Sequence, residues 1–231
     1  MTKAAGATGK SATKKSATRA ATGRTAAKAP AKKAAASKAS AKAATGAAQG
    51  GVEIRPLAAS DEKALLAFAR GLPPHDLLFL PRDISEPKVL KAWIRESEGG
   101  GMTSLVAARG TEIVGCGAIA SDPLSWSPHV GELRVLIGPQ ARGAGVGRAL
   151  TQRLFALALE GGLQRIVAQM TVDQTAAISV FEGLGFRAEA LLRGQVRDRK
   201  GARHDIVILG HEVADVLARL EAFGVVDATS R

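Results

Sequence analysis

The chain has 231 residues and a formal net charge of +11, with 32 basic against 21 acidic side chains. A single cysteine, Cys116, excludes an internal disulfide and is consistent with a reducing compartment. No run of about 18 apolar residues occurs, so no membrane span is expected, and the N-terminus lacks the apolar core of a signal peptide.

The first 50 residues carry all of the net charge. They contain nine Lys and two Arg but no Asp or Glu, so residues 51–231 hold 21 basic and 21 acidic side chains. The segment has low complexity: residues 10–13 (KSAT) recur at 15–18, and residues 31–36 (AKKAAA) resemble the Lys/Ala tails of linker histones. With almost nothing to bury, it cannot offset its ordering entropy, and we predict a disordered tail.

Three interpretations of this tail remain open. The favoured one is non-specific contact with nucleic acid, because clustered Lys and Arg neutralise phosphates. The second is a solvating tail or a modification acceptor. The third is an organellar transit peptide, which fits the missing acids, although the tail is rich in Lys rather than Arg and lacks Leu or Phe for an amphipathic face.

The elements that follow the tail are predicted from apolar spacing, capping residues and turn residues. Cys116 falls in a strand, where a packed core thiol is expected rather than a nucleophile, since a nucleophile needs a partner histidine or helix terminus. In chain order the predicted elements are a strand at 52–55, a helix capped by 60–62 and stopped at 71–74, an unusually apolar loop at 75–85, a helix opened by 86–87, and a hairpin of 103–108 and 112–120 across 109–111.

The central stretch, residues 131–150, predicts a strand, a glycine-rich loop and a helix. Residues 132–137 are rich in β-branched and aliphatic types and stop at Gly138-Pro139. The helix that follows has apolar residues at a 3–4 spacing until Gly161-Gly162. Glycines at alternate positions let an anion approach the unpaired N–H groups of the first helical turn. The chemistry of this stretch suits a pyrophosphate.

The glycine spacing indicates which ligand. It does not match G-x-G-x-x-G, and Ala144 stands where a Walker loop requires lysine. What fits is Gln140-x-x-Gly143-x-Gly145, which resembles the acyl-CoA signature Q/R-x-x-G-x-G/A of the GNAT N-acetyltransferase superfamily.

The sequence after this helix extends the resemblance. A strand at 165–171 precedes residues 173–186, which are similar to the GNAT sequel N-x-x-A-x-x-x-Y-x-x-x-G-F, with Gln174 in place of Asn and Phe181 in place of Tyr. A last hairpin of 187–197 and 203–210 and an amphipathic helix at 213–223 follow. The resemblance covers about 52–210 and implies an α/β GNAT fold, with a mixed, mostly antiparallel sheet and flanking helices. The expected organisation is a tail at 1–50, the domain at 51–213 and a C-terminal helix and end at 214–231.

The resemblance implies that acetyl-CoA is the co-substrate, without a metal. Its pyrophosphate would lie on the N–H groups from about Arg142 to Arg148, and its pantetheine amides along the 132–138 strand, provided that this strand diverges from 165–171. The N–H near Leu136 or Ile137 is the candidate oxyanion donor. The predicted cofactor-binding residues are Leu136, Ile137, Gln140, Arg142, Gly143, Ala144, Gly145, Val146, Gly147, Arg148, Gln174 and Phe181.

An amine acceptor must lose a proton before it attacks, which requires a general base. The resemblance implies that Glu132 is this base. His129 is the alternative, and His204 with Asp205 could serve instead, although a structural role is expected for His204. The leaving thiolate usually receives its proton from the Tyr of the sequel; because Phe181 cannot donate, we expect a slower enzyme.

The predicted function is transfer of an acetyl group from acetyl-CoA to a primary amine in a ternary complex, with protein lysine favoured and small amines possible. The alternative is an acyl-CoA sensor or a chromatin-associated DNA-binding protein with a weakly active GNAT domain. The acceptor would be recognised by residues 71–85 and by the segment around Trp126, where Leu78, Phe79 and Leu80 are apolar candidates. The expected location is the cytoplasm, with association to the nucleoid through residues 1–50.

Overall fold

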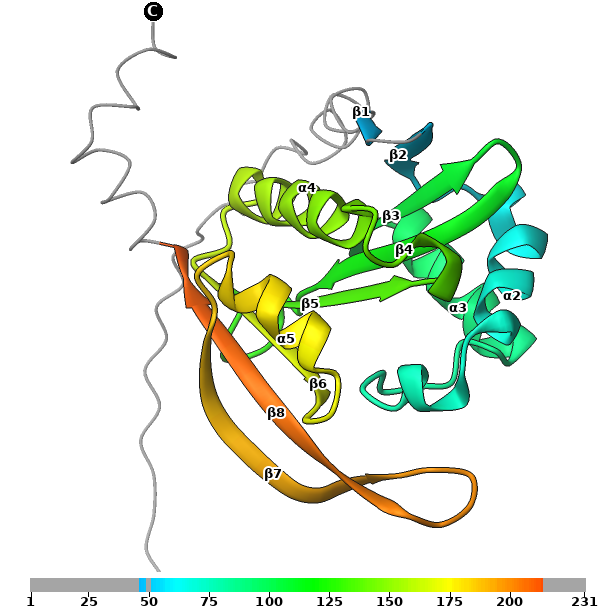
Figure 1. Ribbon diagram of the computed structural model, residues 1–231. Helices are drawn as coiled ribbons and strands as arrows, with labels where there is room; N and C mark the ends of the chain where they lie inside the picture. The colour runs from blue at the N-terminus through cyan, green and yellow to red at the C-terminus, as the bar shows by residue number, and fades with distance from the viewer. Residues whose placement is uncertain (1–45, 49–50, 214–231) are drawn as a thin grey trace, which may run out of the picture. The chain divides into compact units, whose positions relative to one another are not determined.

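The structure is a computed structural model that describes residues 46–48 and 51–213. These residues form one sheet with the strand order β1-β2-β3-β4-β5-β6-β8-β7, in which every neighbouring pair is antiparallel except β5 and β6. The expected mixed, mostly antiparallel sheet is confirmed (Figure 1). The strands are β1 Gly46–Ala48, β2 Val52–Pro56, β3 Met102–Arg109, β4 Glu112–Ala120, β5 Val130–Ile137, β6 Arg165–Thr171, β7 Arg187–Arg197 and β8 Arg203–Glu212.

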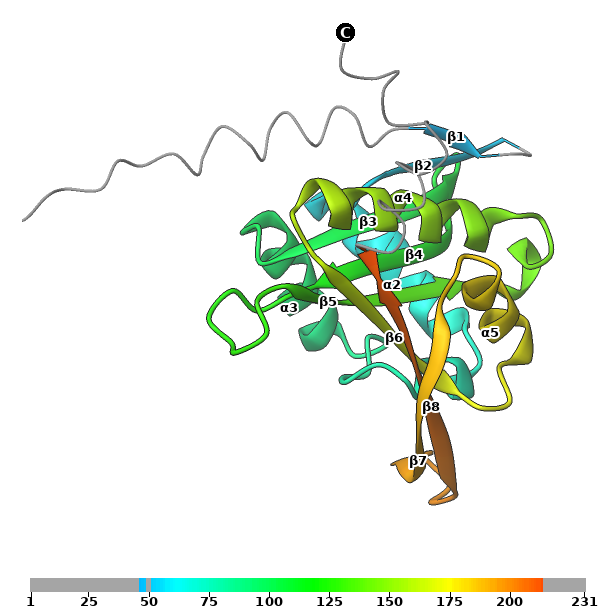
Figure 2. The ribbon, with the colours of Figure 1, turned by 90° about the vertical axis from the view of Figure 1, so that its left-hand side faces the viewer.

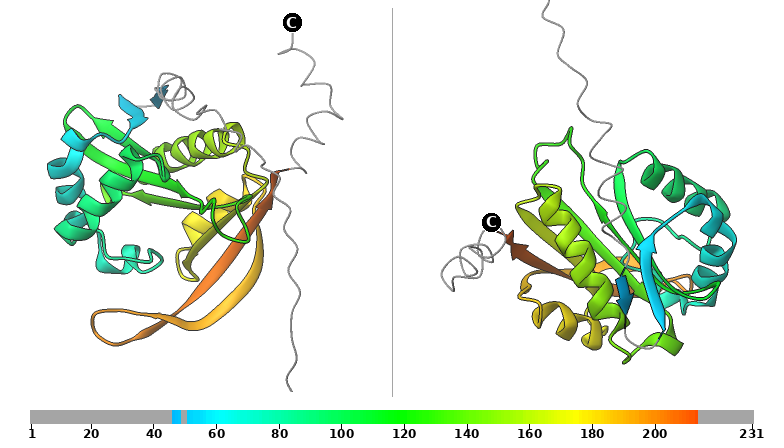
Figure 3. Two further views of the ribbon diagram at one scale, coloured as in Figure 1. Left: turned by 180° about the vertical axis from the view of Figure 1, so that it is seen from behind. Right: turned by 90° about the horizontal axis from the view of Figure 1, so that it is seen from above.

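Helices cover both faces of the sheet. Helices α4 and α5 lie on one face and α2 and α3 on the other, as the view from above shows (Figure 3). None of the helices in the described part of the chain is long and apolar enough to cross a membrane. The helices are α2 Glu62–Gly71, α3 Pro87–Glu98, α4 Val146–Glu160 and α5 Thr175–Glu182, with short 3-10 turns at Ala59–Asp61, Pro74–Leu77 and Pro139–Ala141.

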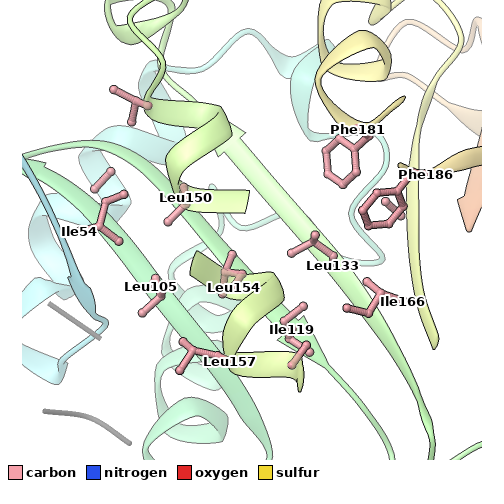
Figure 4. Packing of buried hydrophobic residues seen from close by; sticks show 14 of the residues in the cluster. Ile54, Leu105, Ile119, Leu133, Leu150, Leu154, Leu157, Ile166, Phe181 and Phe186 are labelled. Atoms are coloured by element: carbon pink, nitrogen blue, oxygen red, sulfur yellow. The ribbon is translucent and has the colours of Figure 1, made fainter. Parts of the chain in front are cut away.

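The side chains along each strand point alternately to the two faces of the sheet, and this divides the hydrophobic core into two clusters. Successive strand side chains point to opposite faces, so Leu133 packs under α4 whereas Leu136 packs with α2 and α3. Leu150 and Leu154 of α4 are fully buried against β3 and β5 (Figure 4). Both faces of the central strands are therefore covered, and the remaining open features lie at the strand ends.

The hairpin of β7 and β8 extends past the rest of the sheet (Figure 2). It turns at Lys200-Gly201, where Gly201 has φ +89°, as the sequence predicted. Most of the β7 side chains are exposed, whereas β8 buries Ile206 and Leu209. The hairpin brings His204 of β8 to the side of the domain where the Pro74–Leu77 turn lies.

The largest departure from the predicted boundaries is at the start of the domain. Residues 46–48, assigned to the tail, form β1 and pair with Val52–Ile54 of β2. Small residues carry no pattern of side-chain burial, but their backbone groups can complete the otherwise free edge of β2. Residues 1–45 and most of the helix predicted at 213–223 lie outside the described residues.

The start of α2 also differs in detail. The helix was expected to be capped by residues 60–62; its N-cap is Asp61, which ends a 3-10 turn and makes no side-chain capping hydrogen bond to α2. The Asp61 carboxylate accepts two hydrogen bonds of 2.7 Å from the guanidinium of Arg55 and one of 2.9 Å from the N–H of Ala58. This side chain joins β2 to α2.

Candidate active site

The loop between β5 and α4 has the backbone that its glycines predicted. Gly143 and Gly145 have φ +74° and +77°, and Gly145 is the N-cap of α4. A side-chain carbon at either position would meet nothing within 4 Å, so the space in front of the helix is open. The N–H groups of the first helical turn, which lack partners within the helix, therefore face an accessible volume.

The two predicted arginines of this loop behave differently. The guanidinium of Arg142 donates to the carbonyl of Ile137 at 3.2 Å and to the carboxylate of Asp76. Arg142 thereby links the loop to the Pro74–Leu77 turn, while Arg148 is exposed on the first turn of α4. Both positive charges remain close to the helix N-terminus, where an anion is favoured.

Strands β5 and β6 diverge, as the pantetheine hypothesis required. Their parallel pairing is limited to three register pairs and ends at Glu132↔Val167. Strand β5 continues to Ile137 and stays paired with β4 to that point. From Leu133 to Ile137 the edge of β5 that faces β6 is therefore unpaired (Figure 1), and an unpaired strand edge offers amide groups to an extended ligand.

A cleft of about 420 Å³ lies at this divergence. Strand β5, the glycine loop, α5 and the Pro74–Leu77 turn all contribute residues to its lining. Six predicted cofactor-binding residues are among its lining, and six are not. The lining set comprises Leu136, Ile137, Arg142, Gly143, Gly147 and Gln174, together with His75, Asp76, Phe79, Val135, Asp173, Thr175, Ala176, Ala177 and Val180.

The six predicted residues outside the lining have three different environments. Ala144, Gly145 and Arg148 are exposed at the mouth of the loop, and Val146 is buried beneath it. Gln140 folds over Gly138 and donates to Glu112 at 3.4 Å, so its side chain points toward the β3–β4 turn. The signature glutamine therefore shapes the loop.

Phe181, which replaces the Tyr of the N-x-x-A-x-x-x-Y-x-x-x-G-F pattern, is buried. Its side chain is 5% exposed and packs edge-to-face on Phe186, with ring centroids 5.0 Å apart. Its neighbours on α5, Ala177 and Val180, line the cleft instead.

The two predicted bases also lie outside the cleft lining. Both carboxylate oxygens of Glu132 accept hydrogen bonds from Arg134, at 3.0 and 2.7 Å. Glu132 occupies the last register pair before β5 leaves β6. His129 is exposed in the loop that precedes β5, and its carbonyl accepts from the N–H groups of Gln164 and Arg165.

The structure adds a histidine–carboxylate pair that the sequence analysis missed. His75 Nε2 lies 2.7 Å from Asp173 Oδ2, and both residues line the cleft. The His75 ring also meets the ring of His204 edge-to-face, with centroids 5.0 Å apart. The only sequence signal was that His75 lies in the segment 71–85, assigned to acceptor recognition, since His75 and Asp173 are too far apart in the chain for their spacing to be informative.

The Asp173 carboxylate is held as an anion. Burial raises its pKa, but hydrogen bonds from the Thr171 hydroxyl and from its own N–H, with the neighbouring His75, outweigh this and leave the pKa below its ordinary value.

The Cys116 thiol shows the opposite shift: complete burial raises its pKa to about 12. The thiol is inert near neutral pH, as the core assignment predicted.

The predicted acceptor-recognition residues are dispersed. Phe79 lines the cleft, whereas Leu80 lines a separate hollow with Arg134. Trp126 and Leu124 are almost fully exposed in the loop between β4 and β5. Among residues 46–48 and 51–213, no three histidine, cysteine, aspartate or glutamate side chains are grouped as a metal site.

These features define a domain of the GNAT fold. Residues 74–186, just under half of the chain, match the model of the acetyltransferase (GNAT) family. Crystal structures of the same fold include ribosomal-protein-alanine N-acetyltransferase from Brucella melitensis, with a TM-score of 0.60, 23% identity, and coverage of 69% of this chain and 99% of that one.

Two further similarities concern ligand and sequence. A GNAT superfamily phosphinothricin acetyltransferase from Sinorhizobium meliloti, in complex with acetyl-CoA, superposes with a TM-score of 0.61 at 16% identity, over 70% of this chain and 88% of that one. The IAA acetyltransferase of Azospirillum brasilense is 37% identical over 82 residues, which are 36% of this chain. The matched region spans about half, 52%, of that relative's length.

Proposed function

We propose that this domain transfers an acetyl group from acetyl-CoA to a primary amine. The observation that carries the proposal is the joining, in one cleft, of the unpaired edge of β5 with the glycine turn at the N-terminus of α4. An extended thioester arm fits the strand edge, and a pyrophosphate fits the helix terminus.

The chain's own groups would act as follows. N–H groups between Arg142 and Arg148 would bind the pyrophosphate, with the two guanidiniums at its rim. An N–H of the free β5 edge near Leu136 or Ile137 would stabilise the oxyanion that forms as the amine attacks. Bound acetyl-CoA would supply the activated acyl group, and direct transfer is favoured because the Cys116 thiol is buried.

Glu132 is the base that the family resemblance implies. It lies at the point where the two strands separate, but it would have to release Arg134 before holding a water or a proton. The Glu132→Gln exchange tests the role: loss of turnover with unchanged acetyl-CoA affinity would support it.

For the acceptor, protein lysine is the favoured class and small amines are the second. The relatives suggest a wider panel, since one carries the name of a ribosomal-protein-alanine N-acetyltransferase and another that of an IAA acetyltransferase. Release of CoA thiol should therefore be measured with lysine peptides, alanine N-terminal peptides and free amines. Thiol release with none of them, despite acetyl-CoA binding, would favour the acyl-CoA sensor.

A second function is proposed for residues 1–50. Their eleven basic side chains and absence of acidic ones favour sequence-independent contact with nucleic acid phosphates. Such contact would associate a cytoplasmic enzyme with the nucleoid and hold it near chromatin proteins as acceptors.

A further inference from the structure

One wall of the cleft carries an imidazole that is oriented by a carboxylate. His75 comes from the Pro74–Leu77 turn, and Asp173 directly follows the end of β6. The Nε2 atom of His75 lies 2.7 Å from Asp173 Oδ2 and 3.2 Å from the Thr171 hydroxyl. Within the described part of the chain, the Nδ1 atom forms no hydrogen bond, and the side chain is 32% exposed.

These contacts determine the tautomer of the imidazole. An ionised carboxylate only accepts hydrogen bonds, and Asp173 is kept ionised by the Thr171 hydroxyl and by its own N–H. The hydrogen of a neutral His75 ring therefore lies on Nε2, and the lone pair lies on Nδ1. A carboxylate that fixes one nitrogen of an imidazole so that the other can take a proton is the arrangement used in acid–base catalysis.

We propose that His75 is the catalytic base that takes the proton of the acceptor amine, and that Asp173 is its positioning residue. The proposal rests on the acetyl transfer proposed above and deepens it. His75 lines the same cleft as Leu136 and Ile137, the residues at the free edge of β5.

The step balances without any further reactant. An ammonium group entering the cleft gives one proton to His75 Nδ1, which passes it to water. The neutral amine nitrogen attacks the thioester carbonyl, so the carbon–nitrogen bond forms as the carbon–sulfur bond breaks. The second proton of the nitrogen ends on the CoA sulfur, directly or through water.

Geometry favours His75 over both bases predicted from the sequence. The carboxylate of Glu132 is occupied by Arg134 and lies outside the cleft lining. His129 precedes Ile137 by eight residues, which is roughly 25 Å along an extended strand. His75 lies in the lining, and its Nδ1 atom can accept a proton without the prior breaking of an ion pair.

The charged groups around His75 come from three elements. On its own turn, Asp76 is paired with Arg142 of the glycine loop. At the end of β6 stands Asp173, and from β8 comes His204, whose Nε2 is 3.1 Å from Asp198 of the β7–β8 turn. Asp76 and Asp198 are thus paired with other groups, which leaves Asp173 as the carboxylate bound to His75.

The experiment compares four single variants of the full chain with the wild type, using the best amine from the panel. His75→Gln keeps an amide that can bond to Asp173 but takes no proton. We expect kcat/KM to fall by about 10²–10⁴-fold, with acetyl-CoA affinity unchanged within threefold by calorimetry. Asp173→Asn should lower kcat/KM at least tenfold. His204→Gln, the matched control that removes the neighbouring imidazole–carboxylate pair, should change it less than threefold. Glu132→Gln is the fourth variant and removes the other candidate base, so that the two losses of turnover can be compared.

The pH profile gives a readout that a structural role would not move. Wild-type kcat/KM should fall on the acid side of the pH profile along an imidazole limb, because only an unprotonated base can take the proton, and His75→Gln should lack that limb. If His75→Gln fails to fold, the wild-type profile and the Asp173→Asn variant decide, because the Asp173 side chain is 60% exposed.

The outcomes separate the two proposals. If the wild type releases thiol and His75→Gln does so within threefold of it, the role of His75 is overturned and acetyl transfer still stands. A wild-type pH profile without the imidazole limb has the same consequence. Loss of turnover in Glu132→Gln alone assigns the base to Glu132. No thiol release by the wild type with any amine overturns acetyl transfer and the base together.

Discussion

The residue that bears most directly on ligand binding is Gly145. A Gly145→Asp exchange places a negative charge at the N-cap of α4, where the proposed pyrophosphate would lie. We expect acetyl-CoA binding to be lost, with at least a 100-fold weaker Kd by calorimetry and an unchanged circular dichroism spectrum. Gly201→Asp is the matched control, because Gly201 also has a positive φ and open space around it. Equal acetyl-CoA affinity in the two variants would contradict the site.

The buried ring of Phe181 determines what its replacement by tyrosine would do. The added hydroxyl would enter a core position that is 5% exposed and packed on Phe186. Burying a hydroxyl without a partner costs about 1–3 kcal/mol. We therefore expect Phe181→Tyr to melt at a lower temperature and to turn over no faster. A rate increase in single-turnover assays would show that the ring does reach the CoA sulfur.

At the scale of elements, the ion pair between Arg55 and Asp61 joins β2 to α2. The Arg55 hydrogen bonds are the largest influence on Asp61 and lower the pKa of its carboxyl below the ordinary value, against the opposing effect of burial. An acid with a lowered pKa in the folded state adds stability above its unfolded pKa, near 4, and this stability is lost as the pH falls through the folded value.

Asp61→Asn should therefore lower the free energy of unfolding by about 1–3 kcal/mol at pH 7. The difference from the wild type should start to shrink below about pH 4, the ordinary pKa of the unfolded acid, and it should be lost as the pH falls through the lowered pKa of the folded carboxyl. Urea denaturation at several pH values measures it. Glu62→Gln is the adjacent control: its ion pair with Lys91 spans 3.5 Å between exposed side chains, so a change under about 0.5 kcal/mol is expected. An equally large loss of unfolding free energy in Glu62→Gln would show that the effect comes from any negative charge near the start of the helix, and not from the pairing with Arg55.

Local patterns were sufficient to predict most elements of the domain. The alternation of 52–55, the proline at Pro87 and the glycines at 161–162 each specify a structure within a few residues. Strand β1 was missed because Gly46–Ala48 have no side-chain pattern, and only the free edge of β2 gives them a partner. Edges are properties of the assembled sheet and are not visible in a short window.

The same distinction between local and assembled features decides how much of the candidate site could be predicted. The glycine turn and Arg142 could be predicted, since a contiguous motif encodes them, whereas the divergence of β5 from β6 entered only as a condition. The pairing of His75 with Asp173 could not, because it depends on where the Pro74–Leu77 turn meets the end of β6. Likewise nothing local revealed that Arg134 would occupy Glu132 or that Phe181 would face the core.

For the whole molecule, the partition of charge predicts a partition of function. All eleven net positive charges lie within residues 1–45, and the rest of the chain is balanced. The tail has no aromatic residue for base stacking, so DNA binding should be phosphate-driven and independent of sequence. If about half of its charges engage, log K should fall with log salt at a slope of around −5.

Removal of residues 1–45 tests this prediction. A cut at this point keeps Gly46–Ala48 on the edge of β2, whereas a cut after residue 50 would strip β1 and confound the result. The shortened chain should lose DNA binding in gel shifts at low salt yet keep its acetyl-CoA turnover, since the cleft draws only on residues after Pro74. A second control replaces the tail lysines with glutamine in the full-length chain. This variant loses the positive charges of the lysines but keeps the tail segment. Tight DNA binding by the shortened chain, or equal binding by the glutamine variant, would place the contact on the folded domain instead.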